Sequence, residues 1–145
     1  LTAILEVFGG TPGDFSEESG AQAARLLVQG RLPADAVFAA NDQMAVGLIA
    51  ELAASGMSVP GDIMVAGFDD IPLARHLNPS LTTMQVKIDR LGSTAMMMLL
   101  RILRGETLAA ASATILTPTL VARGTTGGGA GRSIMAKVPV LGADA

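Results

Sequence analysis

Three side chains suited to binding a small polyhydroxylated ligand stand where short predicted strands end. Asn41 and Asp69 each follow an apolar run directly, and Phe15 follows the turn cluster after the first predicted strand. An ionised carboxylate accepts hydrogen bonds from two neighbouring hydroxyls, an amide both donates and accepts, and an aromatic ring covers the apolar face of a sugar or stacks on a base. These residue types together predict a binding site for a sugar-like metabolite.

Each of the three residues also has a purely structural interpretation. Phe15 could be a core residue, Asn41 could be only the N-cap of a helix, and Asp69 could be only a turn former. The sequence leaves both interpretations open for each residue.

Four neighbouring polar residues are assigned structural roles. Asp42 is predicted to cap the helix that follows it, because an acidic residue at a helix start satisfies free backbone N–H groups. Asp70 is predicted to order its loop, and Arg75 and His76 are predicted to be exposed.

The elements that must position the candidate site form a strand–helix–strand unit. The apolar runs Ala36–Ala40 and Ile63–Gly67 are predicted strands, and between them Met44, Leu48 and Leu52 recur at helical spacing before Gly56. Such a unit implies a parallel sheet covered on both faces, with ligands bound beyond the carboxyl ends of the strands.

The remaining elements follow from apolar periodicity, caps and breakers. The predicted helices and helical turns are Glu17–Gln29, Pro72–His76 and Ile88–Arg104, and the predicted strands are Ala3–Phe8, Leu81–Gln85, Ala113–Leu116 and Leu120–Ala122. The helix Ile88–Arg104 is apolar around most of its circumference, so it needs more packing partners than a small open sheet supplies.

Composition narrows the function classes. The 145 residues are 50% hydrophobic and 16% charged, and the chain has a net charge of -3 and a pI near 5.0. A chain that binds DNA by itself is expected to carry a positive net charge, so the negative charge argues against this function. The chain has no cysteine and one histidine, so thiolate and multi-histidine metal sites are excluded. No apolar run is long enough to span a membrane, and no membrane association is expected.

Catalysis and cofactor binding are not expected. The sequence contains no G-x-S-x-G motif and no P-loop, and any catalytic triad would have to use His76. The Gly9–Gly13 cluster lacks the dinucleotide-binding spacing. The chain begins at Leu1 without a visible signal peptide, and we expect it to be a fragment.

Several motifs, in order, resemble the lactose repressor/galactose repressor (LacI/GalR) family of transcriptional regulators. They are DFSEESG, AND-x-MA-x-G, G-x-x-VP-x-D-I-x-V-x-GFDD, P-x-LTT and a helix beginning near LG, and together they cover about Gly13 to Thr126. The resemblance implies an α/β, bilobed, periplasmic-binding-protein-like type I fold with a ligand in the cleft between lobes. The chain is similar to a three-layer second lobe plus a crossover helix, Ile88–Arg104, that belongs to the first lobe.

The resemblance implies a cytoplasmic, homodimeric regulator that senses a sugar or related metabolite. The family's ring-stacking aromatic falls on Phe15, its ligand amide on Asn41 and its ligand carboxylate on Asp69. Operator DNA would be bound only through an N-terminal helix-turn-helix that this sequence does not contain. The alternative, which shares the fold, is a periplasmic sugar-binding protein of a transporter.

Three departures from the family pattern bear on this interpretation. Val86 stands where members often have glutamine, the segment GGTPG before Asp14 is unusual, and the tail lacks the leucine heptads of tetrameric members. We expect residues 1–126 to form the C-terminal portion of an effector-binding domain and residues 127–145 to form a flexible tail.

Overall fold

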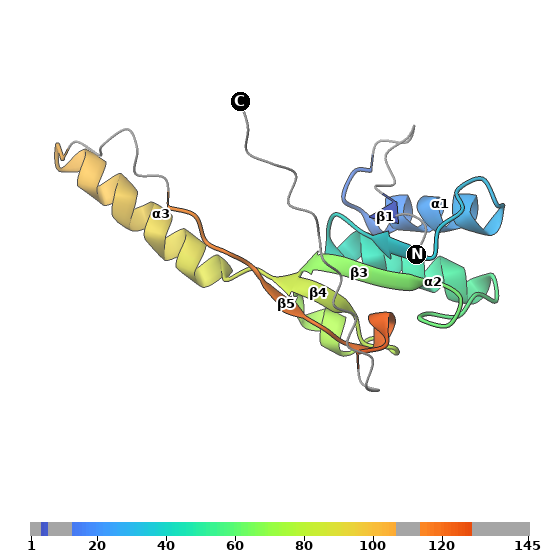
Figure 1. Ribbon diagram of the computed structural model, residues 1–145. Helices are drawn as coiled ribbons and strands as arrows, with labels where there is room; N and C mark the ends of the chain where they lie inside the picture. The colour runs from blue at the N-terminus through green and yellow to red at the C-terminus, as the bar shows by residue number, and fades with distance from the viewer. Residues whose placement is uncertain (1–3, 6–12, 107–113, 129–145) are drawn as a thin grey trace, which may run out of the picture.

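The computed structural model describes residues 4–5, 13–106 and 114–128, and it contains one mixed sheet and three α-helices (Figure 1). The helices are α1 (Glu17–Val28), α2 (Asp42–Ala54) and α3 (Ile88–Leu103), with 3₁₀ turns η1 (Pro72–Arg75) and η2 (Gly124–Thr126). The strands are β1 (Ile4–Leu5), β2 (Ala36–Phe38), β3 (Met64–Asp69), β4 (Thr82–Gln85) and β5 (Thr119–Val121).

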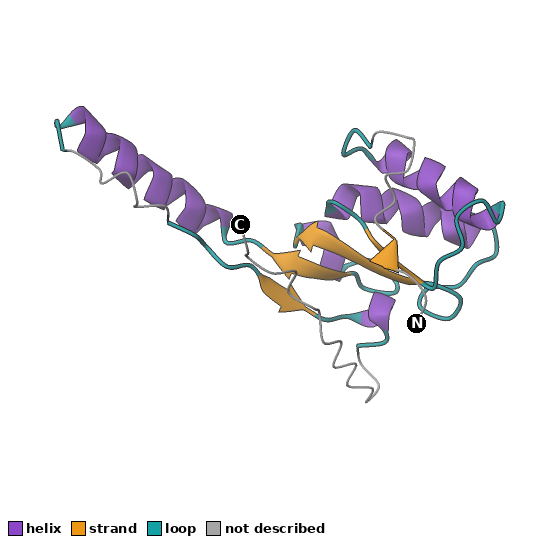
Figure 2. Cartoon of the chain, turned by 45° about the horizontal axis from the view of Figure 1, so that its top comes forward, coloured by secondary structure: helices purple, strands orange, loops and turns teal. Residues whose placement is uncertain are grey.

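The sheet has the order β1-β2-β3-β4-β5, in which the first four strands are parallel and β5 runs antiparallel at the edge. Because successive parallel strands are neighbours and crossovers are right-handed, the connecting helices fall on one face. Figure 2 shows α1 and α2 side by side over the sheet. The predicted α/β class with a parallel sheet is confirmed.

Burial alternates along the central strands. Val37 in β2 and Val65 in β3 are buried against the helices, whereas Phe38 is 45% exposed on the opposite face. Helices therefore cover one face of the sheet within the described residues, whereas the sequence predicted a sheet covered on both faces. The core shared by the sheet and helices includes Ala24, Leu27, Ala45, Leu48, Leu52, Ile63 and Leu81.

Two glycines allow α1 and α2 to approach closely. A Cβ at Gly20 would overlap the Met44 carbonyl oxygen, and a Cβ at Gly47 would overlap the Glu17 carbonyl oxygen. Since both obstacles are backbone atoms of the facing helix, they cannot move aside as a flexible side chain would. Backbone contact therefore sets the distance between α1 and α2, and the two helices form a rigid layer behind the sheet.

Most predicted elements are present with boundaries shifted by a few residues, as expected where helix ends fray. The main difference is β3, which continues to Asp69, so Asp69 is its last residue. Residues 114–116 do not form a strand, and in this segment only residues 119–121 pair with β4. Most of the predicted strand Ala3–Phe8 and of the predicted tail 127–145 lies outside the described residues.

α3 extends away from the sheet as an arm (Figure 1). No residue of α3 is buried by the part of the chain that the structure describes. Its exposed apolar residues are Ile88, Leu91, Met96, Met97, Leu99, Leu100, Ile102 and Leu103. This exposure is consistent with the prediction that the helix needs more packing partners than a small sheet supplies. Within the described ranges, no helix has the length and apolar character required to cross a membrane.

We predict that Gly47→Ala lowers the free energy of unfolding by about 3 kcal/mol, because the new methyl group forces α1 and α2 apart. The matched control is Gly92→Ala on α3, where a Cβ would meet no atom within 4 Å. Alanine there should stabilise the helix by up to about 1 kcal/mol. Urea denaturation of both variants measures the difference, and equal midpoints would contradict the backbone contact.

We also predict that the 145-residue chain self-associates through α3, since large exposed apolar surfaces promote association. Sedimentation velocity at increasing protein concentration should show the mean sedimentation coefficient rising. The variant Leu99→Lys/Leu103→Lys places two charges on the exposed surface and should shift the distribution toward monomer. If the unmodified chain sediments as a monomer at all concentrations, the apolar surface of α3 does not mediate self-association.

Candidate functional site

The candidate site lies at the carboxyl end of the parallel strands. In the register of β2 and β3, Phe38 is paired with Ala66. Asn41 lies three residues after the end of β2, and Asp69 is the last residue of β3, so both residues lie at the carboxyl ends of neighbouring strands. The structure thus places two of the three predicted ligand residues at the sheet edge where α/β proteins bind ligands.

Phe15 is joined to this edge through its backbone. Its carbonyl oxygen accepts a hydrogen bond from Asn41 Nδ2 at 3.0 Å, and its φ of 64° lies in the left-handed region. Phe15 is 61% exposed, so its interpretation as a core residue is wrong. An exposed ring held beside a polar edge is available to cover an apolar ligand face.

Asn41 is the N-cap of α2, which confirms the capping interpretation. Its Oδ1 accepts a hydrogen bond from the Met44 backbone N–H at 2.8 Å, while its Nδ2 donates to Phe15. An amide has two donors and two acceptor lone pairs, so one of each remains after these two bonds. Asn41 can therefore cap the helix and still contact a ligand.

Asp69 has a half-buried carboxylate that makes no hydrogen bond with the described residues. An Asx turn would need such a bond, so the side chain does not stabilise the turn. Burial raises the pKa of Asp69, and the nearby charge of Asp42 raises it further. Hydroxyl donors from a ligand would satisfy this carboxylate and favour its ionised form.

Asp42 does not cap α2, contrary to the prediction. Asn41 takes the cap, which leaves Asp42 as the first helical residue with 0% of its surface exposed. Its Oδ1 accepts from the Thr83 hydroxyl at 2.6 Å, and its Oδ2 accepts from the Ile71 backbone N–H at 2.9 Å. Either residue of an Asn-Asp pair can cap a helix. Here the Thr83 and Ile71 donors, which are distant in sequence, occupy the Asp42 carboxylate and leave the cap to Asn41.

Gly67 makes room for the buried carboxylate. A Cβ at Gly67 would overlap Asp42 Oδ1, so a side chain on β3 at this point would displace the carboxylate. In the sequence, Gly67 is only the end of an apolar run. Its separation from Asp42 along the chain concealed their contact.

Asp70 orders its loop as predicted, through a partner that the sequence did not reveal. Its side chain is 3% exposed and forms an ion pair with Arg123, in which Nη2 and Oδ1 are 2.6 Å apart. Arg75 and His76 are exposed, as predicted. Within the described ranges, no group of three or more His, Asp or Glu side chains could hold a metal ion.

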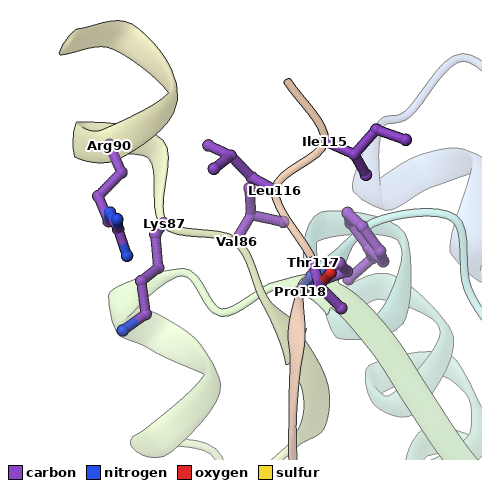
Figure 3. A pocket seen from close by; sticks show the side chains of 8 residues that line it. Val86, Lys87, Arg90, Ile115, Leu116, Thr117 and Pro118 are labelled. Carbon is purple, nitrogen blue, oxygen red and sulfur yellow. The ribbon is translucent and has the colours of Figure 1, made fainter. Parts of the chain in front are cut away.

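A separate cavity of about 300 Å³ lies where α3 begins, and none of the three candidate residues lines it. Phe68, Val86 and Pro118 contribute apolar walls, and Lys87 and Arg90 contribute charge. Figure 3 shows Lys87 and Arg90 on one side of Val86 and Pro118 on the other. Val86, at the position where members of the family often have glutamine, therefore lines this cavity.

Comparison with known proteins identifies the family. Residues 4–126 match the periplasmic binding protein-like domain. The chain is 41% identical over 89 residues to the lactose operon repressor of Rhizobium radiobacter, covering 61% of this chain and 79% of that protein. It is 41% identical over 112 residues to the ribose operon repressor of Escherichia coli K12, covering 77% of this chain and 34% of that protein.

A solved structure agrees with these similarities. The LacI family transcriptional regulator from Arthrobacter sp. FB24, in complex with lactose, has 34% sequence identity and a TM-score of 0.68, covering 77% of this chain and 41% of that chain. The chain thus spans about a third of the ribose operon repressor and well under half of the solved regulator. The chain belongs to the lactose repressor/galactose repressor family of transcriptional regulators, and it corresponds to part of their periplasmic-binding-protein-like, effector-binding domain.

Proposed function

We propose that this chain is the effector-sensing part of a DNA-binding transcriptional regulator and that it binds a sugar or related small metabolite through Phe15, Asn41 and Asp69. The observation that carries the proposal is the Asp69 carboxylate. It is partly desolvated, it stands at the ligand-binding edge of the sheet, and it makes no hydrogen bond with the described residues. A carboxylate in that state gains most from two adjacent hydroxyl donors, which sugars supply.

The neighbouring groups fit the same ligand class. The exposed Phe15 ring can cover the apolar C–H face of a sugar ring, and the free donor and acceptor of Asn41 can bind a further hydroxyl. The relatives support this class, since two are named for the lactose and ribose operons and the solved Arthrobacter regulator holds lactose.

The regulator is favoured over a transporter's periplasmic sugar-binding protein, because the relatives are repressors. With a net charge of -3, this chain is poorly suited to hold DNA phosphates itself. Operator DNA would therefore be bound by a helix-turn-helix outside this sequence. We further propose a cytoplasmic, non-enzymatic homodimer, with residues 1–126 forming the C-terminal portion of its effector-binding domain.

We predict that Asp69→Ala in the complete regulator weakens sugar binding while the fold is retained. Each lost charge-assisted hydrogen bond costs about 1.5–3 kcal/mol, which corresponds to about a tenfold to a hundredfold lower affinity. Calorimetric titration with lactose, ribose and cellobiose first identifies a sugar that binds the unmodified protein, and this sugar is then titrated into the variant.

Asp89→Ala is the matched control for this experiment, because Asp89 is an exposed carboxylate on α3. Its affinity should equal that of the unmodified protein. If Asp69→Ala binds the sugar within twofold of the unmodified protein, Asp69 is not part of the site.

We predict that Asn41→Ala and Asn41→Ser separate the two roles of the amide. Alanine removes the cap and should lower stability by about 0.5–2 kcal/mol, whereas serine preserves the capping oxygen. Both variants lose the Nδ2 donor, so both should bind the sugar more weakly. Thermal unfolding and calorimetry together test this, and a serine variant with unchanged affinity would limit Asn41 to capping.

A further inference from the structure

Two consecutive non-glycine residues at the candidate site have left-handed backbone conformations. The φ angle is 114° at Asp69 and 56° at Asp70. Such a conformation is unfavourable for a residue with a side chain, and it persists only where the surrounding structure enforces it. The contacts that enforce it here therefore also decide where the Asp69 carboxylate lies.

The enforcing contacts converge on Asp70 rather than on Asp69. Asp70 Oδ1 accepts from Arg123 Nη2 at 2.6 Å, and Asp70 Oδ2 accepts from Gln85 Nε2 at 2.8 Å. Its backbone N–H donates to the Thr83 hydroxyl at 3.3 Å. Burial raises the pKa of Asp70, but the hydrogen bonds from Arg123 and Gln85 outweigh it, and the pKa lies below its ordinary value. The buried carboxylate is thus held ionised.

Arg123 is itself fixed at both ends. Its Nη1 donates to the Leu81 carbonyl oxygen at 2.8 Å, and its backbone N–H donates to the Thr82 hydroxyl at 2.7 Å. The Thr82 hydroxyl also donates to the Arg123 carbonyl oxygen at 3.1 Å. The planar guanidinium therefore spans a backbone carbonyl and a carboxylate, which a lysine ammonium cannot reproduce in the same geometry.

We infer that Arg123 is a positioning residue for ligand recognition, because its fork between Leu81 and Asp70 holds the strained Asp69–Asp70 turn that presents the Asp69 carboxylate to the site. The inference rests on the proposed function for the identity of Asp69 as the ligand residue. Arg123 touches no ligand in this role, and it lies 53 residues from Asp70 along the chain.

The test uses the ionisation of Asp69, which needs no ligand. Carboxyl ¹³C NMR on the 145-residue chain should give a raised Asp69 pKa, because the carboxylate is partly desolvated beside Asp42. In Arg123→Met the turn should relax, the carboxylate should reach solvent, and its pKa should fall toward the ordinary aspartate value. Loss of the Arg123 charge without any movement of the turn would instead leave the pKa of Asp69 unchanged or raise it. A pKa that does not fall would overturn the inference.

Two further variants separate positioning from general destabilisation. Arg123→Met leaves Asp70 as an uncompensated buried charge and can unfold the chain. Arg123→Met/Asp70→Asn removes both charges together, and in this variant the Asp69 pKa should still fall. Thr125→Val removes the hydroxyl that accepts from the Thr82 N–H at 2.8 Å, and so weakens the same C-terminal segment without touching Asp70. Its Asp69 pKa should match the unmodified chain.

Sugar binding by the complete regulator distinguishes this inference from the proposed function. The sugar that binds the unmodified protein should bind Arg123→Met/Asp70→Asn about tenfold or more weakly, and Thr125→Val within twofold. If Asp69→Ala leaves sugar binding intact but the Asp69 pKa falls as described, the positioning role stands and the proposed ligand contact fails. If Asp69→Ala weakens binding but the double variant changes neither pKa nor affinity, Arg123 does not position Asp69.

Discussion

The buried carboxylate of Asp42 joins the elements at the carboxyl end of the sheet, where the candidate site lies. One of its oxygens accepts from the Thr83 hydroxyl and so joins α2 to β4, and the other accepts from the Ile71 N–H and so joins α2 to the loop after β3. A fully buried charge without partners would be strongly unfavourable, so both donors must stay in place. The same charge contributes to the raised pKa of Asp69, and it therefore also shapes the electrostatics of the site.

The tightly packed helix pair and the candidate site lie in different parts of this structure. The helix pair, held at backbone contact by Gly20 and Gly47, forms a rigid layer behind β2 and β3. The strained turn at Asp69 and Asp70 sits at the edge of that layer, where the packed elements can offset its cost. A strained turn held by packed elements suits the proposed sensor, because the proposed ligand residues would be oriented before a ligand arrives.

The elements that sequence reasoning located best are those specified by local patterns. α2 has an asparagine cap and apolar residues at helical spacing, and α1 begins at Ser16 with two acidic residues in its first turn. The segment at residues 114–116 resembles a strand equally well, yet it has no strand partner within the described residues, since β4 pairs with residues 119–121. A strand depends on a neighbour that its own residues do not specify.

Local sequence patterns are enough to predict the parallel α/β class, the positions of Asn41 and Asp69 at strand ends, and the family. The roles of individual polar residues depend on the folded chain. Tertiary structure assigned the cap to Asn41, buried Asp42 against Gly67, and paired Asp70 with an arginine 53 residues away. Local propensity depends on residues within a few positions of one another, whereas hydrogen bonds to buried carboxylates depend on segments that meet only after the sheet has formed.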